Sequence, residues 1–488
     1  MLTFADVWQA LSGQALQSLR PFTIASFCVD SRRCVSRSLF VALKGEQSDG
    51  HRYITDALAR GAQYIIADVR DVNPQEVRPA IGSGTWVDLS SAFAAGSSDS
   101  SVQPPEPLTL PVVVVTPNSL RALQEIAGWW RRKFSGQVVG ITGSIGKTVT
   151  KEVVASVLSQ RYRTFKSEGN LNSETGLPLA LLMMEGRPER MVLEMGMYDL
   201  GEIQRLAEIS QPRIGVVTNV GPSHLERLKS LERIAEAKAE LVQALPPDGW
   251  AILNGDDERV RAMRASTRAR AMFYGLEPTN DVWASEVEGL GLQGIRFWLH
   301  HTDEQPLHVR IPLLGQHSVH TALAGAAVGL AEELSWEEII RGLQQVSGQL
   351  RLVAVPGFNG STLLDDTYNA SPASSIAALN LLCELNGRKI AVLADMLELG
   401  NFEREGHLLV GGRAAQVCDV LITVGARART IGQSAIEAGL PPERVQFCAN
   451  KSDCIERLKE ILQAGDMVLL KGSRGMAMEE VVAALTSE

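Results

Sequence analysis

The sequence has few cysteines and no CxxC pair. Its 488 residues include six cysteines, and none of them belongs to a CxxC motif. Structural zinc sites and small disulfide frameworks depend on such spacings, so both are disfavoured. We expect reduced, mostly structural thiols at the six positions, which are Cys28, Cys34, Cys383, Cys418, Cys448 and Cys454.

The sequence also lacks a long apolar run and an excess of basic residues. The longest stretch of small apolar residues, 322–331, is too short and too rich in glycine to cross a bilayer. The first residues, MLTFADVWQALSGQ, show neither the basic lead nor the apolar core of a signal peptide. The net charge of -9 argues against general binding to nucleic acids or anionic membranes. We therefore expect a soluble, cytoplasmic protein.

The chain is long and has ample apolar residues for burial. At 488 residues it exceeds one compact core, and an apolar content of 45% suits about three globular domains. Residues 90–111 are dense in serine and proline, which predicts an exposed linker. After this stretch, short β-branched runs alternate with helical patterns, which is typical of parallel strands joined by helices. We predict an α/β protein with domains 1–110, 111–345 and 346–488.

One segment in the middle of the chain resembles a phosphate-binding loop. The strand pattern 138–142 runs into GSIGKT, and a helical pattern follows from Thr150 to Leu158. Backbone N–H groups of such a turn can bind phosphate oxygens, Lys147 can reach the outer phosphates, and the Thr148 hydroxyl can ligate Mg²⁺. The first glycine of the full motif is replaced by Ile141, so an ordinary glycine turn is the alternative.

Three residues further along could complete a phosphoryl-transfer site, and each also has a plainer interpretation. Glu194 ends the apolar strand MVLEMG, where it is either a metal ligand or an exposed strand-end carboxylate. His224 lies in a loop, where a histidine is more often structural. Lys238 interrupts the apolar stripe of the helix 231–245. It either extends its ammonium group to solvent or is buried, and a buried neutral amine can react with carbon dioxide to form a metal-binding carbamate.

Several segments, in one order along nearly the whole chain, resemble the ATP-dependent Mur ligase family of peptidoglycan synthesis. The C-terminal run LLDDTYNASPAS (363–374) is similar to the branch that adds D-alanyl-D-alanine. It has Asn369 to Pro372 where the diaminopimelate-adding branch has a DNPR-like run. The other matching segments are 29–62, 141–152, 169–182, 193–197, 218–241, 392–400 and 469–482.

The resemblance implies an amide ligase with one domain for each substrate. The first domain would bind UDP-N-acetylmuramoyl-tripeptide, the central P-loop domain would bind ATP, and a Rossmann-like C-terminal domain would bind D-alanyl-D-alanine and close on ATP. ATP would phosphorylate the tripeptide carboxylate, and the dipeptide amine would then displace phosphate from the acyl phosphate. We expect a monomer that binds no nucleic acid and does not insert into membranes.

The resemblance also assigns roles to residues. Lys147 would neutralise the transferring phosphoryl group, Thr148 and Glu194 would hold one Mg²⁺, and His224 and a carbamylated Lys238 would hold a second. Arg351 and Asp366 would act from the C-terminal domain. The ATP-binding set is Gly143, Ser144, Ile145, Gly146, Lys147, Thr148, Arg351, Asp366, Tyr368 and Asn369. The set for the UDP substrate is Ser31, Arg32, Lys44, Gly45, Asp49, Gly50, His51, Asn170, Asn172 and Thr175.

The chain departs from the family pattern at several positions. Ser318 and Thr321 replace two asparagines of the adenine-binding segment, which puts those contacts in doubt. Arg37 stands where the family has a glycine, and we expect a different backbone conformation there. Two alternatives stay open: a sibling ligase that adds a single amino acid, and a nucleotide-binding module that has lost its chemistry.

Overall fold

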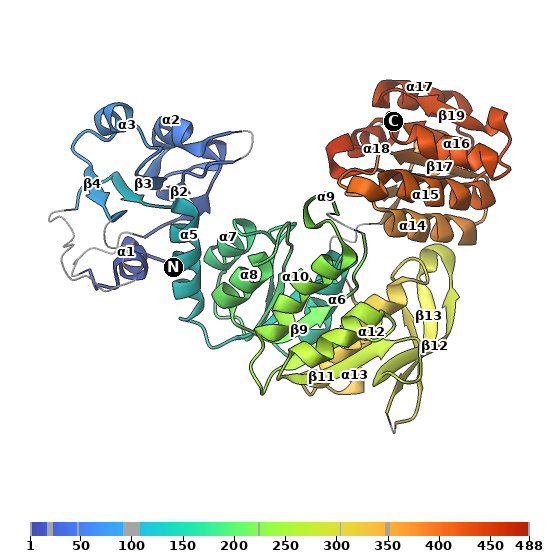
Figure 1. Ribbon diagram of the computed structural model, residues 1–488, viewed down its shortest axis with the longest axis horizontal. Helices are drawn as coiled ribbons and strands as arrows, with labels where there is room; N and C mark the ends of the chain where they lie inside the picture. The colour runs from blue at the N-terminus through green and yellow to red at the C-terminus, as the bar shows by residue number, and fades with distance from the viewer. Residues whose placement is uncertain are drawn as a thin grey trace. The chain divides into compact units, whose positions relative to one another are not determined.

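The computed structural model describes residues 2–16, 23–45, 48–90, 108–222, 225–302, 304–346 and 352–486 (Figure 1). The chain divides into two compact units. The first unit comprises Met1–Val138, Ser167–Met195 and Gln204–Gln211, and the second comprises Val139–Lys166, Gly196–Ile203 and Pro212–Glu488. Helices alternate with mostly parallel strands throughout, as expected for an α/β protein.

The first unit is built on a parallel sheet with the strand order β1-β2-β3-β5-β4. One face packs on α2 and α3 through a cluster that includes Phe40, Ile54 and Val77. On α1, Phe4 stacks on Tyr64 of β3, with the ring centroids 5.5 Å apart. The strands are β1 (Ser26–Cys28), β2 (Ser38–Val41), β3 (Ala62–Asp68), β4 (Thr85–Asp88) and β5 (Val112–Thr116), and the helices are α1 (Phe4–Ser12), α2 (Ile54–Ala59), α3 (Pro74–Ile81) and α5 (Ser119–Arg131).

The position of β5 corrects the expected start of the central domain. We predicted that this strand begins the domain 111–345, but it pairs in parallel with both β3 and β4 of the first sheet. The valines of β5 are all buried, so the strand contributes to the first core. The stretch 90–111, most of which lies outside the described residues, therefore links two strands of one sheet. Serine and proline content predicts an exposed connection but does not say whether the connection separates domains.

The second unit contains a sheet in which β14, β13, β12, β11, β10, β9 and β6 follow one another in space. The strands from β9 to β12 run parallel, and β12, β13 and β14 form an antiparallel extension. Helix α12 packs against α6 and carries the small apolar residues 322–331, so this run forms a buried core helix. The strands are β6 (Gln137–Thr142), β9 (Pro212–Val217), β10 (Trp250–Asn254), β11 (Arg270–Gly275), β12 (Val282–Gly289), β13 (Ile295–His301) and β14 (Leu307–Ile311).

The remaining elements of this middle part of the chain are divided between the two units. The helices of the second unit are α6 (Lys147–Leu158), α9 (Leu225–Leu228), α10 (Leu231–Gln243), α11 (Glu258–Ala262), α12 (Ser318–Ala331) and α13 (Trp336–Gln344), and the short strand β7 (Thr164–Lys166) also lies in it. The first unit contains α7 (Gly176–Leu182), β8 (Arg190–Glu194) and most of α8 (Glu202–Ser210).

The C-terminal part of the second unit has its own sheet, drawn in orange and red in Figure 1, with the strand order β15-β16-β20-β17-β18-β19. Only β15 is antiparallel to its neighbour. Two separate cores show that α14, α15 and α16 cover one face of the sheet and α17 and α18 the other. This three-layer arrangement is the predicted Rossmann-like domain.

The elements of the C-terminal sheet have the following bounds. The strands are β15 (Val353–Pro356), β16 (Thr362–Asp366), β17 (Lys389–Ala394), β18 (Val420–Val424), β19 (Val445–Cys448) and β20 (Met467–Lys471). The helices are α14 (Pro372–Glu384), α15 (Glu403–Val417), α16 (Arg429–Glu437), α17 (Lys451–Ile461) and α18 (Glu479–Thr486). Together with the two sheets described above, this sheet confirms an α/β fold of three domains; the boundary near residue 345 stays a prediction.

Candidate active site

The predicted phosphate loop is a strand, a glycine turn and a helix, as the sequence indicates. The fully buried end of β6 leads into Gly143, and Gly146, with a φ of 85°, precedes the first residue of α6. A Cβ atom on Gly143 would lie 1.8 Å from Oγ1 of Thr218, so glycine is required at this close approach. The loop is thus shaped by its contact with the end of β9.

Side chains after β9 hold the turn in place. The N–H group of Ile145 donates to Oδ1 of Asn219 at 2.9 Å, and Thr218 Oγ1 donates to the Ile145 carbonyl at 2.6 Å. Ser144 and Gly221 exchange two further hydrogen bonds between the loop and the same segment. These contacts fix a turn at the N-terminus of a twelve-residue helix, a position that favours an anionic ligand.

Lys147 and Thr148 begin α6. Lys147 Nζ donates to the carbonyl oxygens of Gly143 at 2.8 Å and Ser144 at 3.4 Å, so the ammonium group lies over the loop. Thr148 is buried in the first turn of the helix. The two side chains predicted to contact phosphate and metal therefore come from the same helical turn.

Lys238 lies on the buried side of α10. Its side chain is 2% exposed, and Ile234, Leu241 and Val242 of the same stripe are completely buried. The lysine does not extend to solvent, which excludes the snorkelling interpretation. Burial, followed by the positive charge of Lys147, lowers the pKa of Lys238 well below its ordinary value. A neutral amine in this position has the nucleophilic lone pair that carbamate formation requires.

Glu194 ends β8 in the first unit and is 1% exposed, so it is not the exposed strand-end carboxylate of the alternative interpretation. Its Oε1 accepts a hydrogen bond from Nδ2 of Asn172 at 2.7 Å, and the hydroxyl of buried Ser167 accepts one from its backbone N–H at 3.4 Å. Asn172, predicted to contact the UDP substrate, therefore orients a carboxylate, a contact that we did not expect. Asn170 is exposed, and Thr175 is partly exposed at the start of α7.

Two predicted site residues, His224 and Arg351, lie outside the described residues. His224 directly precedes α9, and Arg351 precedes β15. Their roles stay predictions.

The turn Asp30–Cys34 carries two of the residues predicted for the UDP substrate. Ser31 is buried in a short 3-10 helix, η1 (Ser31–Arg33), and the Asp30 carboxylate caps it by accepting from the N–H group of Arg32 at 3.0 Å. The exposed guanidinium of Arg32 also pairs with Asp30, with NH2 and Oδ2 2.7 Å apart. This pair lowers the pKa of Asp30 to about 2.

The loop between residues 44 and 51 is held together by its own predicted ligand-binding residues. Asp49 caps a second 3-10 helix, η2 (Gly50–Tyr53), and accepts from Nδ1 of buried His51 at 2.7 Å. His51 Nε2 accepts from the N–H group of Asp68 at 2.9 Å, so both ring nitrogens have partners within the protein. A Cβ atom on Gly50 would lie 2.8 Å from the backbone of Leu43.

Two further predicted residues of this loop remain at its surface. Lys44 Nζ pairs with Asp71 at 3.1 Å and is well exposed, and Gly45 donates its N–H group to the carbonyl of Ser48 at 2.9 Å. Among the residues predicted for the UDP substrate in η1 and in this loop, Arg32 and Lys44 are thus charged and exposed, whereas Asp49, Gly50 and His51 stabilise the loop.

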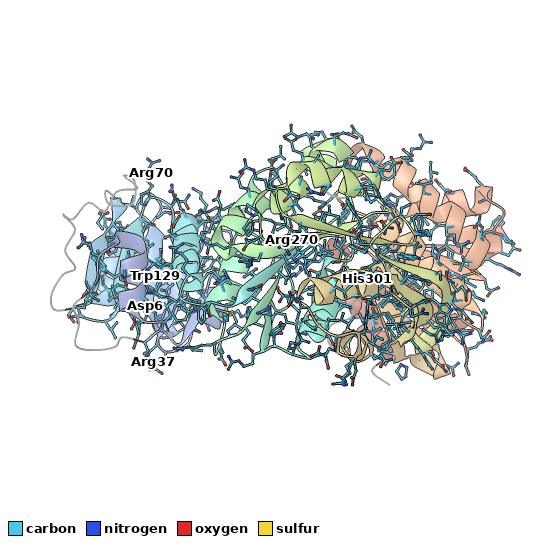
Figure 2. All side chains as sticks on the ribbon, turned by 90° about the horizontal axis from the view of Figure 1, so that it is seen from below. Asp6, Arg37, Arg70, Trp129, Arg270 and His301 are labelled. Carbon is cyan, nitrogen blue, oxygen red and sulfur yellow. The ribbon has the colours of Figure 1, made fainter. Side chains whose placement is uncertain are left out.

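Arg37 retains the backbone conformation that a glycine would have. Its φ is 65°, so our expectation of a different conformation is wrong. The side chain, labelled in Figure 2, is exposed, and its NH1 group donates to Oγ1 of Thr23 at 3.2 Å. An arginine in the left-handed region costs about 1 kcal/mol, which the surrounding fold offsets.

The C-terminal sheet joins Asp366 to a lysine that we did not predict. Asp366 ends β16, Lys471 ends the neighbouring β20, and Lys471 Nζ lies 2.6 Å from Oδ2 of Asp366. The lysine is 2% exposed and also donates to the carbonyl of Asn369 at 2.8 Å. Arg474 lies over the ring of Tyr368, 5.4 Å from its centroid. Lys471 could have been suspected from the sequence, because it directly ends the apolar run MVLLK.

The segment that replaces the adenine-binding pattern uses one of its hydroxyls internally. Ser318 Oγ donates to the carbonyl of Leu314 at 2.7 Å, at the start of α12. His320 Nε2 pairs with Asp256 Oδ2 at 2.8 Å. The Ser318 hydroxyl therefore donates its proton to a backbone carbonyl within the protein.

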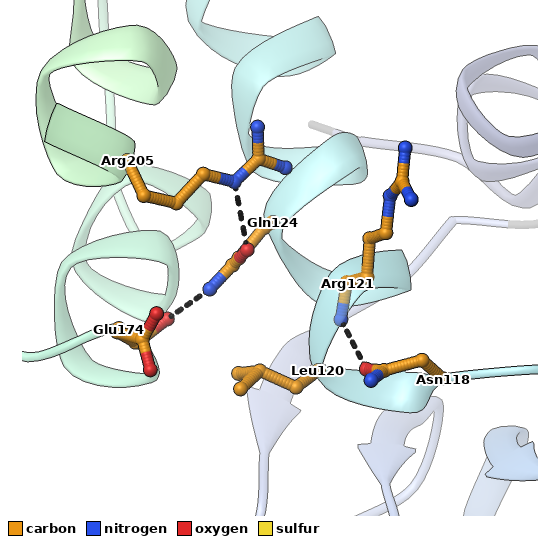
Figure 3. A pocket seen from close by; sticks show the side chains of 6 residues that line it. All are labelled: Asn118, Leu120, Arg121, Gln124, Glu174 and Arg205. Atoms are coloured by element: carbon orange, nitrogen blue, oxygen red, sulfur yellow. Dashed lines mark hydrogen bonds between the residues drawn. The ribbon is translucent and has the colours of Figure 1, made fainter. Parts of the chain in front are cut away.

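A cavity of about 360 Å³, lined by Leu120 and by five polar or charged residues, lies in the first unit (Figure 3). Gln124 of α5 lies between two elements: its Oε1 accepts from Nε of Arg205 at 2.9 Å, and its Nε2 donates to the carbonyl of Glu174 at 3.2 Å. Asn118 caps α5 at the rim by accepting from the N–H group of Arg121 at 2.8 Å. The cavity borders the segment that contains Thr175, but it includes none of the residues predicted for the UDP substrate.

Family models match three parts of the chain. The model of the Mur ligase family catalytic domain matches residues 23–95, the Mur ligase middle domain matches 141–329, and the Mur ligase glutamate ligase domain matches 350–474. The first match contains the strands of the first sheet except β5, the second begins within β6, and the third contains the whole C-terminal sheet.

Two curated relatives and two solved structures are similar over nearly the full length. The UDP-N-acetylmuramoyl-tripeptide--D-alanyl-D-alanine ligase of Bacillus subtilis is 33% identical over 94% of this chain and 92% of its own, and the ligase of that name from Escherichia coli is 31% identical over 99% and 98%. The crystal structure of MurF from Acinetobacter baumannii has a TM-score of 0.80 at 28% identity, covering 100% and 99% of the two chains. MurF from Thermotoga maritima in complex with ADP has a TM-score of 0.76 at 26% identity, covering 95% and 97%.

Proposed function

The chain belongs to the Mur ligase family, and we propose that it joins D-alanyl-D-alanine to UDP-N-acetylmuramoyl-tripeptide while ATP is converted to ADP and phosphate. The observation that carries the proposal is that the second unit contains both the phosphate loop, with Lys147 over its carbonyls, and Lys238, which is buried in the apolar stripe of α10. A loop of this shape serves phosphate binding, and a lysine buried at such a position is typical of a functional site.

The reaction requires activation of a carboxylate. A carboxylate oxygen of the tripeptide attacks the γ-phosphorus of ATP, and the bond between that phosphorus and the bridging oxygen breaks to release ADP. The free amine of D-alanyl-D-alanine then attacks the acyl carbon, loses a proton and expels phosphate. Lys147, whose Nζ lies over the loop carbonyls, neutralises charge on the transferring phosphoryl group.

The side chains available for magnesium fit a hard cation. Thr148 offers a hydroxyl and Glu194 a carboxylate, both of the oxygen type that Mg²⁺ prefers. Bound Mg²⁺ would neutralise the charge of the phosphate oxygens. Asn172, by donating to Oε1 of Glu194, fixes the orientation of that carboxylate.

Lys238 is proposed to be carbamylated. The neutral amine adds to carbon dioxide and loses a proton, which converts a nitrogen ligand into an anionic oxygen pair suited to a second Mg²⁺, with His224 as its partner. The low pKa of the buried amine supports this step.

The C-terminal domain is proposed to contact ATP and to bind the dipeptide. Asp366, Tyr368, Asn369 and Arg351 form the proposed nucleotide set. Lys471 neutralises Asp366 and binds the carbonyl of Asn369, so it is a positioning residue for both.

The remaining proposals concern the UDP substrate and the state of the protein. Arg32 and Lys44 are the exposed cations suited to the diphosphate, whereas Asp49, Gly50 and His51 shape the loop that presents them. In the part of the chain that the structure describes, no helix is long and apolar enough to cross a membrane. We infer a monomeric, cytoplasmic enzyme.

A phosphate-release assay with different amines tests the proposal. The purified protein receives ATP, Mg²⁺ and UDP-N-acetylmuramoyl-tripeptide, together with D-alanyl-D-alanine, diaminopimelate or lysine. We expect release only with D-alanyl-D-alanine. The corresponding assay with UDP-N-acetylmuramoyl-dipeptide and a single amino acid would, if positive, assign the protein to a sibling activity. No release with any combination would indicate a module without chemistry.

A further inference from the structure

Cys28 and Cys34 form a buried pair of thiols in the first unit. Cys28 ends β1, and Cys34 directly follows η1. Each is 6% exposed, and their sulfur atoms lie 3.0 Å apart. A disulfide bond is about 2.05 Å long, so the atoms need to approach by only about 1 Å to form one.

Each of the two sulfur atoms also lies near a backbone carbonyl oxygen. Cys28 Sγ lies 3.8 Å from the carbonyl oxygen of Leu39, and Cys34 Sγ lies 4.0 Å from that of Asp30. Both cysteines belong to the core cluster that covers one face of the first sheet. Buried cysteines usually pack as small apolar residues, but here each sulfur has the other as its nearest polar partner.

We propose that Cys28 and Cys34 are a reversible thiol–disulfide site that restrains the turn carrying Ser31 and Arg32. The five residues between the two cysteines include the whole of η1 and its cap, Asp30. A bond between the cysteines closes a ring around this turn. The cross-link itself follows from the geometry of the pair, whereas its effect on the enzyme rests on the proposed function.

The oxidation is an exchange with a low-molecular-weight disulfide. Burial raises the pKa of both thiols, while the hydrogen bond from Cys28 opposes the rise at Cys34. Cys34, as its thiolate, attacks one sulfur of the small disulfide and expels the first small thiol. Cys28 then attacks the Cys34 sulfur of the mixed disulfide and expels the second. Two protein thiols are oxidised, and one small disulfide is reduced to two thiols.

The burial of the pair predicts slow oxidation, because the turn must open to admit the reagent. Once formed, the disulfide pulls Cys34 toward β1 and changes the position of Ser31 and Arg32. We expect the KM for the UDP substrate to rise roughly 10- to 100-fold, since displacements near 1 Å have effects of this size. The KM for ATP should stay constant, because the phosphate loop belongs to the second unit.

The first experiment maps the disulfide. A Cys383→Ser variant, which lacks the exposed thiol, is incubated with oxidised glutathione, alkylated and digested for mass spectrometry. We expect a peptide pair joined through Cys28 and Cys34 that dithiothreitol separates. Recovery of both cysteines in alkylated form, or of stable mixed disulfides with glutathione, would overturn the proposal.

The second experiment compares the oxidised and reduced forms of the same protein, with Cys34→Ser in the Cys383→Ser background as the control that cannot form the bond. A cross-link without a change in the KM for the UDP substrate would refute the effect on the turn. A protein that forms the cross-link but releases no phosphate in either state would contradict the proposed function and leave the thiol site supported.

Discussion

The phosphate loop of the second unit and the segment Ser31–His51 of the first unit are both rich in motif residues, yet these residues serve different purposes. In the loop, the segment after β9 holds the turn, and Lys147 and Thr148 begin a helix whose N-terminus suits an anion. In the first unit, Asp49 accepts a hydrogen bond from His51, and His51 in turn accepts one from the backbone N–H group of Asp68. Among the side chains predicted for the UDP substrate in the described part of this segment, those of Arg32 and Lys44 are exposed cations.

This contrast shows that a sequence motif marks two kinds of residue. Some contact the ligand, and others build the loop from which the contacts are made. A motif alone does not separate them, because a buried histidine with two partners and an exposed lysine are equally visible in the sequence. Burial and hydrogen bonding separate them, and substitutions can test the separation.

The largest effect is expected for Lys147→Ala. Removing the ammonium group should lower kcat for phosphate release by roughly 10³-fold, as for other groups that stabilise transition-state charge, with no loss of stability. Arg32→Ala, in contrast, should mainly raise the KM for the UDP substrate. Steady-state kinetics with each substrate varied would measure both. Equal losses of kcat in the two variants would contradict the different roles assigned to Lys147 and Arg32.

Lys238→Ala should lower kcat by roughly 10²-fold, because the proposed metal-binding carbamate is lost. A short carboxylate such as acetate should restore part of the activity by occupying the space of the carbamate. Glu236→Ala changes an exposed residue of the same helix and serves as the control. Activity of Lys238→Ala close to that of the unchanged protein would refute the carbamate.

His51→Ala should act on stability rather than on chemistry. The substitution removes the ring bond to Asp49, which keeps its bond from the backbone N–H of residue 51, and leaves the Asp68 N–H group without its partner at a cost of about 1–3 kcal/mol. Urea unfolding followed by a probe in the first unit would measure the change, with the exposed neighbour Arg52→Ala as control. A histidine that contacts the substrate instead would lower activity and leave the urea midpoint unchanged.

The smallest effect is expected for Arg37→Gly. Glycine adopts a φ of 65° without strain, so the variant should be about 1 kcal/mol more stable, less a few tenths for the added freedom of the unfolded chain. Arg70→Gly, at an exposed turn position with ordinary backbone, should be neutral or slightly destabilising. Both residues are labelled in Figure 2. Thermal unfolding of the first unit would rank the two variants.

Much of the fold follows from the sequence. The runs VVGIT, MVLEMG and KIAVLAD predict strands within one or two residues of β6, β8 and β17, because a fully buried parallel strand is a continuous apolar run. The antiparallel strands β12 to β14 were not predicted. Their exposed face carries Trp283, Trp298 and charged residues, so neither a continuous apolar run nor a clear helical period marks them.

The candidate site likewise contains some features that the sequence could predict and others that it could not. The helix that carries Lys238 has a clear apolar stripe, so its burial could be suspected from spacing alone. The partners of Glu194 and Asp366, which are Asn172 and Lys471, lie 22 and 105 residues away along the chain. Such contacts depend on how strands are ordered in the sheet. The position of β5 depends on the same strand order, which is why the first domain boundary was placed too early.

The most direct test of the account follows one oxygen atom. The tripeptide substrate is prepared with ¹⁸O in its terminal carboxylate and converted with ATP, Mg²⁺ and D-alanyl-D-alanine, and the released phosphate is examined by mass spectrometry. An acyl phosphate intermediate predicts that each phosphate carries one oxygen from the carboxylate, so phosphate and amide share the label. Unlabelled phosphate, released while the second labelled oxygen leaves as water or stays in unconverted tripeptide, would contradict it.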